Sequence, residues 1–219
     1  MAGLNHVTRG GEPLTIALSP TVTLTKVSVG PMDNNAYLLT SGDATVLVDA
    51  ANDAATLRGL LGDRNLDTVV TTHRHHDHTG ALADLAQTGA RLVAGTPDAE
   101  AIAGDTGVRR PDGVWDGDGV ALGDERLDVV GLVGHTPGSV VLAYRGPDGP
   151  THLFTGDSLF PGGPGKTWSP EDFTSLMDDL EAKVFAVYDD DTVVHPGHGD
   201  DTTLGAERPH LAGWRERGW

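Results

Sequence analysis

The stretch TTHRHHDHTG, Thr71–Gly80, holds four of the chain's ten histidines within six positions, with an aspartate among them. A solvated polar turn, a tag-like histidine run and a metal-binding loop would each fit this stretch alone. His73 and His75 lie two positions apart just after an expected strand, and residues at i and i+2 of an extended segment point to the same side. These two imidazoles could therefore bind one ion, while Asp77 and His78 turn toward a neighbouring point.

Three further residues follow the ends of expected strands, as the histidine cluster does. His135 stands in GHTPGS after RLDVVGLV, Asp157 in TGDSLF after THLFT, and His198 in HPGHG after TVVH. Functional residues commonly lie on loops at one rim of a sheet scaffold, and imidazole and carboxylate suit zinc and other first-row divalent metals. The sequence thus favours a site for two ions. One expected ligand set is His73, His75 and His135, the second is Asp77, His78 and His198, and Asp157 bridges them.

The remaining histidines are expected to lie outside this site. His76 occupies a spacer position in the cluster and is interpreted as a non-ligand. A structural or solvated role is expected for His6, His152, His195 and His210, although His195 could also be a buried group beside the site. Asp49, at the end of an apolar strand, could orient a ligand histidine through a hydrogen bond or could simply cap the strand.

Length and composition limit the possible classes of protein. The chain has 219 residues, which suits a single domain spanning residues 1–219, and it has no cysteine, so no thiolate site or disulfide is available. It carries 15 Lys+Arg against 32 Asp+Glu, a formal charge of −17, which disfavours nucleic-acid and anionic-membrane partners. No secretory signal or membrane-spanning run stands out, so a cytoplasmic location is expected.

Hydrophobic patterning predicts strands mixed with helices, an α+β fold of sheets with helices outside. The expected strands are 21–29, 36–40, 45–50, 66–72, 90–95, 126–133, 139–145, 151–157 and 191–199. The expected helices cover 53–62 (capped by Asn52 and ended by Gly62), 79–89 (ended by Gly89) and the segment after Ser169, with Pro170 at its first position. Residues 1–13 are expected to be loose, and 104–119 and 160–168 are expected to be Gly-rich loops.

The motifs H-x-H-x-D-H, G-H-T-P-G, T-G-D and P-G-H-G occur in this order, after GPMDNNAYLL and TVLVDA near the N-terminus. This set resembles the metallo-β-lactamase superfamily and, more narrowly, its glyoxalase II (hydroxyacylglutathione hydrolase) branch. The resemblance extends from about Val27 to Arg208. It implies a four-layer αββα sandwich with the site at one edge, and the ligand roles given above.

Such a site predicts a hydrolase. Two divalent ions, zinc or alternatively iron or manganese, would lower the pKa of a bridging water from about 15.7 toward 7, and the hydroxide would attack a carbonyl carbon. Asp77 and Asp157 are the candidate catalytic carboxylates. No residue stands out as a general acid, which favours a thioester or activated ester, because a thiolate of pKa about 8.5 leaves with little help. The resemblance likewise implies hydrolysis of the thioester of a small thiol carrier.

The resemblance also implies substrate contacts. Lys166, in GPGKTW, matches a family lysine that binds the carrier's carboxylate, and Trp168 stands where the family has an aromatic residue. Only 21 residues follow His198 (219 − 198), so the sequence is expected to be a short form without the C-terminal helical domain of the long members. Because the long members use that domain to contact the carrier, the identity of the carrier stays open: it could be glutathione, mycothiol or another thiol.

Several rival functions remain open from the sequence. A persulfide dioxygenase would use one iron on His73, His135 and Asp157, since two histidines and a carboxylate suit iron and oxygen chemistry. A lactonase or other ester hydrolase on the same scaffold is a further alternative, and a metal-binding scaffold kept for protein contacts is a third.

Overall fold

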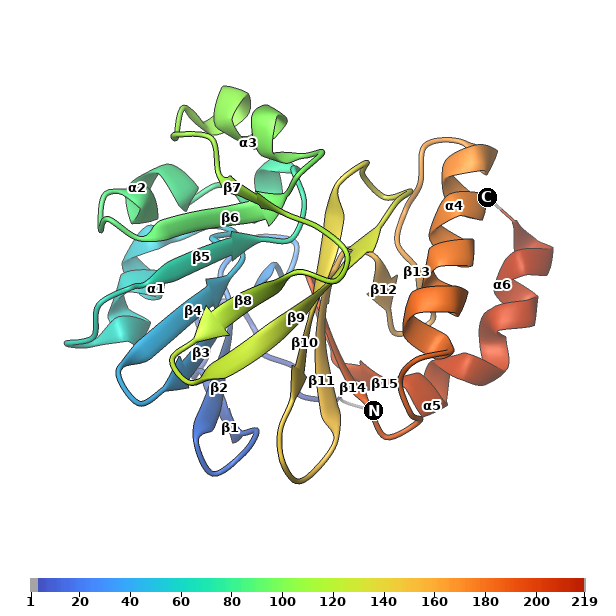
Figure 1. Cartoon of the computed structure of the whole chain (residues 1–219), viewed down its shortest axis with the longest axis horizontal. Coiled ribbons are helices and arrows are strands. Elements are labelled where there is room, and N and C mark those ends of the chain that lie inside the picture. The colour runs from blue at the N-terminus through green and yellow to red at the C-terminus, as the bar shows by residue number, and fades with distance from the viewer. Residues whose placement is uncertain (1–3, 219) are drawn as a thin grey trace.

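Two mixed β-sheets lie face to face in the computed structural model, which describes residues 4–218, and helices cover their outer faces (Figure 1). The first sheet has seven strands in sequential order, antiparallel from β1 to β4 and parallel from β4 to β7. Its strands are β1 (Leu14–Ala17), β2 (Val22–Ser28), β3 (Asn35–Ser41), β4 (Ala44–Val48), β5 (Thr68–Thr71), β6 (Arg91–Gly95) and β7 (Asp112–Val114).

The second sheet has six strands in the order β15-β14-β11-β10-β9-β8. Only β11 and β14 run parallel, and the other neighbours are antiparallel. Its strands are β8 (Gly119–Leu122), β9 (Glu125–Leu132), β10 (Ser139–Arg145), β11 (Thr151–Gly156), β14 (Val193–Pro196) and β15 (Thr202–Thr203), and a separate hairpin pairs β12 (Leu159–Phe160) with β13 (Gly163–Pro164).

Helices pack against the outer face of each sheet, so the expected αββα sandwich is confirmed (Figure 1). The helices on the first sheet are α1 (Ala54–Leu61), α2 (Leu82–Ala86) and α3 (Ala99–Thr106), with the short 3₁₀ turn η1 (His76–His78) before α2. Those on the second are α4 (Pro170–Asp179), the π-helical η2 (Leu180–Phe185), α5 (Leu204–Glu207), η3 (Arg208–His210) and α6 (Leu211–Arg217). Among residues 4–218, no helix combines the length and apolar character needed to cross a bilayer.

Apolar side chains fill three layers, as this arrangement requires. Leu24, Tyr37, Leu142 and Phe154 belong to the layer between the two sheets. One further layer joins the first sheet to α1–α3, and another joins the second sheet to α4–α6. β5 and β10 have nearly every residue buried, which explains why their sequences are continuous apolar or β-branched runs and not alternating ones.

Local sequence signals explain most element boundaries, with three corrections. The cap of α1 is Asp53, whose carboxylate accepts from Thr56 N at 3.1 Å, and not Asn52. The expected helix over 79–89 is shorter, because α2 covers only Leu82–Ala86 and a turn with Gly89 at φ 86° follows it. The expected loop 160–168 contains the β12–β13 hairpin.

The expectation of an irregular loop over 104–119 was wrong in part. The helix α3 ends at Thr106, and β7 covers Asp112–Val114 within that range. The eight-residue α3 buries only Ala99 and Ile102, so it shows almost no apolar periodicity. The three-residue β7 depends on pairing with β6, and neither signal is visible locally.

A buried polar network connects the two sheets. Lys26, on β2, is 0% exposed, and its Nζ donates to Asp201 Oδ1 at 2.7 Å and to Gly199 O at 2.8 Å. His195 Nδ1 donates to Asp201 Oδ2 at 2.8 Å, and His195 Nε2 lies 2.9 Å from His152 Nδ1. This network fixes the Pro196–Asp201 loop, which follows β14. His152 and His195 therefore have structural positions.

The start of the described chain joins the same network. Leu4 forms an isolated β-bridge with Asp201, and Asn5 Nδ2 donates to Asp201 Oδ2 at 3.0 Å. Val7 is buried as well. The segment expected to be loose thus has specific contacts within its described part, while residues 1–3 lie outside the described residues.

The Lys26→Met variant tests how much this network contributes to the stability of the fold. Removing the cation leaves Asp201 Oδ1 buried without its lysine partner, so we expect the free energy of unfolding to fall by about 3 kcal/mol or more. The matched control is Arg91→Met, which breaks an exposed ion pair with Asp112 and should cost about 1 kcal/mol or less. Urea denaturation of both variants provides the measurement, and equal losses would contradict the assignment.

Candidate metal centre

Four separate loops bring the candidate metal ligands to one edge of the sandwich. Asp49 and His73 come just after the ends of the parallel strands β4 and β5. Asp157 and His198 come just after the ends of the parallel strands β11 and β14. His135 lies on the β9–β10 connection. Carboxyl ends of neighbouring parallel strands meet at the same edge of a sheet, and here the two sheets place those edges together.

The first expected ligand set is brought together as predicted. His73, His75 and His135 can each place one ring nitrogen within 4.8 Å of the others. Their ring centroids are 4.6 to 4.7 Å apart. The Nε2 atoms of His73 and His135 are buried and have no hydrogen-bond partner among the described residues.

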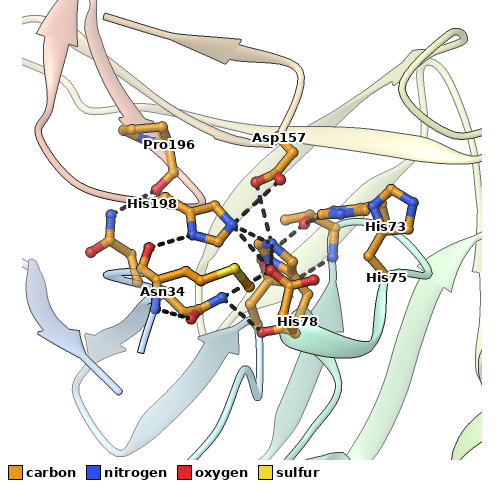
Figure 2. A network of polar contacts seen from close by, with 12 residues as sticks. Asn34, His73, His75, His78, Asp157, Pro196 and His198 are labelled. Carbon is orange, nitrogen blue, oxygen red and sulfur yellow. Dashed lines mark hydrogen bonds and ion pairs between the residues drawn. The ribbon is translucent and has the colours of Figure 1, made fainter. Parts of the chain in front are cut away.

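The second expected set converges beside the first (Figure 2). Asp77 and His78 come from η1, which is one turn long, and His198 comes from the loop after β14. The Nε2 atoms of His78 and His198 lie 3.2 Å apart. Asp77 Oδ2 lies 3.6 Å from His78 Nε2 and 3.3 Å from His198 Nε2.

Asp157 lies between the two sets, with its carboxylate pointing toward the histidines in Figure 2. Its Oδ1 is 3.2 Å from His78 Nε2, and its Oδ2 is 3.4 Å from His198 Nε2 and 3.7 Å from His135 Nε2. Oδ1 is buried and makes no hydrogen bond within residues 4–218. A carboxylate in this position can reach either ligand set.

Asp49 orients members of both sets. It adopts a left-handed backbone conformation (φ 59°) and accepts from Thr72 N at 2.7 Å and from Thr72 Oγ1 at 2.8 Å. His78 Nδ1 donates to Asp49 Oδ2 at 2.8 Å, and Thr72 Oγ1 lies 3.1 Å from His73 Nδ1. With Nδ1 engaged, each ring presents Nε2 to the centre.

Backbone carbonyl groups orient two more rings. His135 Nδ1 donates to Lys166 O at 2.6 Å, and His198 Nδ1 donates to Met32 O at 2.8 Å. These bonds fix the tautomer in which Nε2 has a free lone pair facing the centre.

Two residues that the sequence analysis did not single out support the ligands. Asn34 Nδ2 donates to Asp77 Oδ2 at 3.0 Å, and Asn34 forms a β-bridge with His198. Asp98 is fully buried, and its Oδ2 accepts from Arg74 N at 3.0 Å and from Thr136 Oγ1 at 2.6 Å. The only sequence signal for Asn34 was its place in GPMDNNAYLL, and Asp98 had none.

The shifts in histidine pKa differ between the two ligand sets. Burial lowers the pKa of His73 well below its usual value. Burial also acts to lower the pKa of His78 and His198, but neighbouring carboxylates outweigh it and raise both pKa values to about 10. The hydrogen bond with His198 lowers the pKa of Asp77 to about 2, and contacts with His198 and His78 hold the pKa of Asp157 well below its usual range despite burial.

This arrangement fits divalent metal ions. Buried, unpaired Nε2 and carboxylate oxygen atoms cost free energy unless a cation or proton satisfies them. Three such atoms face this centre, on His73, His135 and Asp157. The donors are imidazole and carboxylate, with no sulfur, which suits zinc, iron or manganese.

The other predicted residues lie around the centre. Trp168 is 58% exposed with its ring centroid 6.1 Å from that of His75, and Lys166 Nζ lies 4.4 Å from the centroid of the Trp168 ring. Both side chains are therefore at the rim. His76 is exposed and outside all three ligand groups, as expected.

The sequence and the fold were compared with known proteins. The hydroxyacylglutathione hydrolase of Photobacterium profundum is 34% identical over 196 residues, 84% of this chain and 71% of the relative. That of Anaeromyxobacter dehalogenans is 36% identical over 168 residues, 76% of this chain but only 61% of the relative. The crystal structure of ETHE1 from Myxococcus xanthus superposes with a TM-score of 0.71 at 27% identity, covering 88% of this chain and 86% of that one.

The family expected from the four motifs is confirmed. Residues 29–198 match the metallo-beta-lactamase superfamily, a range that contains every candidate ligand. The chain belongs to the metallo-β-lactamase superfamily.

Proposed function

We propose that this protein is a metal-dependent hydrolase that cleaves thioesters of a small thiol carrier. The observation that carries the proposal is the complete set of seven donors, Asp157 and the six side chains around it, with three buried donor atoms lacking a partner among the described residues. The similarity to two enzymes named hydroxyacylglutathione hydrolase supports the same reaction class.

The candidate ligands would bind two divalent ions, and zinc is the proposed metal. Such ions supply Lewis-acid activation of water and of the substrate carbonyl group. The chain's own residues then position the reactants. Asp77, held by Asn34 Nδ2, would accept a hydrogen bond from the nucleophilic water and orient it.

The seven candidate ligands include no general acid, and this limits the kind of leaving group. Once the histidines act as ligands and both aspartates are ionised, none of these seven side chains holds a proton to donate. An amine leaving group needs such a donor, whereas a thiolate with pKa about 8.5 does not. The donor set thus favours a thioester over an amide.

Lys166 and Trp168 are the proposed contacts to the carrier. Lys166 is an exposed cation at the rim of the centre in a chain of charge −17, and its position above the Trp168 ring provides a cation beside an apolar face. An anionic, partly apolar carrier arm would be bound by this pair.

The one-iron alternative makes a different prediction about the metal content. It needs only His73, His135 and Asp157, whereas the structure also assembles Asp77, His78 and His198. Elemental analysis of the purified protein, combined with oxygen uptake in the presence of a thiol persulfide, separates the two. One iron per chain with oxygen consumption would reject the hydrolase.

The Asp157→Ala variant tests the bridging role. We expect kcat/KM on a thioester to fall at least about 100-fold, because even groups that only orient ligands cost 10- to 100-fold. Metal content should fall while the circular-dichroism spectrum is retained. Asp148→Ala, at an exposed turn, is the control for loss of one carboxylate. Undiminished turnover in Asp157→Ala would remove this residue from the mechanism.

Proton release on metal binding tests the electrostatics. Neighbouring carboxylates raise the pKa values of His78 and His198 to about 10 in the metal-free protein, so this pair of rings holds excess proton at pH 7. Zinc must displace it, so binding should release at least about one proton and affinity should rise with pH toward 10. Titration calorimetry in buffers of different ionisation enthalpy measures this release. His198→Asn should release about one proton fewer, and pH-independent affinity would contradict the account.

A further inference from the structure

A cavity of about 300 Å³ opens beside the metal centre, and both His135 and Trp168 line it. Its lining includes Arg74, Val133, His135, Pro137, Trp168 and Asp172. His135 is also a candidate ligand, so whatever occupies the cavity lies next to the reacting atoms. The volume is at the small end for ligand-binding sites, which suits a short substrate arm.

The walls of this cavity are held in place. The buried Asp98 carboxylate accepts from Arg74 N and from Thr136 Oγ1, so one side chain fixes two segments of the lining. At Gly134 an added Cβ would overlap the backbone oxygen of Asp172, which places the loop before His135 directly against the first turn of α4. The cavity is thus built by packed elements.

The charges in the cavity distinguish it from the rest of the surface. Arg74 is exposed and makes no ion pair with any residue in 4–218. The chain has 32 acidic and 15 basic residues, so most of its charges repel anions. An arginine beside the centre that has no ion-pair partner can bind an anionic group of the substrate there. Asp172, half-buried on the same lining, would repel a group with more than one negative charge.

A second cavity lies beside Pro164–Thr167, the residues just before Trp168. It has a volume of about 290 Å³ and is lined by Lys166, Phe173 and Arg217. Lys166 Nζ lies over the ring of Trp168, which lines the first cavity, so the two cavities adjoin along Lys166–Trp168. A thioester has two arms, and the structure offers one cationic cavity for each.

We propose that the Arg74 cavity is the subsite for the acyl arm of the substrate and that it selects an acyl chain ending in a carboxylate. This inference rests on the proposed thioester hydrolysis and on the assignment of the carrier arm to Lys166. Arg74 pairs with the terminal carboxylate through its guanidinium, and Val133 and Pro137 contact the methylene groups. The single charge of a carboxylate is compatible with Asp172, whereas a phosphate is disfavoured.

Three thioesters test the proposal on the zinc-loaded protein. The first two are the glutaryl and pentanoyl thioesters of N-acetylcysteamine, which differ by a charge on the acyl arm. The third is the pentanoyl thioester of 3-mercaptopropionate, which carries its charge on the thiol arm. We expect Arg74→Ala to lower the glutaryl-to-pentanoyl ratio of kcat/KM about tenfold or more, chiefly through KM, with Arg74→Lys in between.

The control is Arg64→Ala, which removes an exposed arginine far from the centre and should leave kcat/KM for all three thioesters unchanged. An unchanged glutaryl-to-pentanoyl ratio in Arg74→Ala, or an equal change in Arg64→Ala, would overturn the proposal. Loss confined to the mercaptopropionate thioester would overturn the acyl assignment and place the thiol arm in this cavity. Metal content is measured on every variant, so loss of zinc from the neighbouring His73 and His75 is recognised.

A binding measurement separates this inference from the proposed function. The ketone analogue of the glutaryl thioester, with CH₂ in place of sulfur, is titrated calorimetrically into the wild type and Arg74→Ala. Arginine-dependent binding without turnover of any thioester would support the cavity and reject the hydrolase. Turnover with arginine-independent binding of the analogue would support the hydrolase and reject the cavity assignment.

Discussion

The rest of the site depends on the crowding of seven donor groups at the junction of two sheets. Three imidazoles come within 4.8 Å of one another on one side, two imidazoles and a carboxylate do so on the other, and Asp157 lies between them. Buried lone pairs on His73 and His135 have no partner within residues 4–218. Such crowding is unfavourable in a metal-free protein, where protons on His78 and His198 partly offset it, and it becomes favourable when divalent cations replace those protons. The same cost explains why so much of the surrounding structure orients the rings.

The supporting contacts come from both halves of the sandwich. Asp49, after β4, controls His78 directly and His73 through Thr72. From β2, Lys26 reaches across to Asp201 and Gly199 and thereby fixes the loop that carries His198. The geometry of the metal centre therefore depends on the packing of the two sheets, because a shift of either sheet would separate the two ligand sets. Binding of metal ions should in turn stabilise the packing of the sheets.

The candidate ligands could be picked out because each follows a strand end and carries a distinctive residue type, and their order matches one family. The longer strands followed from apolar runs or alternation, whereas the four-residue strands β1 and β8 were not predicted. Asn34, Asp98 and the Lys26–Asp201 pair could not be predicted in this way. Their partners lie 43, 38 and 175 residues away, and a single asparagine, aspartate or lysine has no local periodicity that would indicate burial. The helix α3 and the strand β7 were missed for a related reason, since tertiary pairing forms them where local propensity is weak.

The proposed chemistry joins these observations into one account, in which the centre activates water and two adjoining cationic cavities position the arms of a thioester. Its central claim is that the seven donors bind a pair of ions. Crystals grown with excess zinc, with anomalous diffraction recorded on both sides of the zinc edge, test that claim most directly. The account predicts two peaks, one beside His73, His75 and His135 and one beside Asp77, His78 and His198, with Asp157 within reach of both. Separated side chains with no anomalous density between them would contradict it.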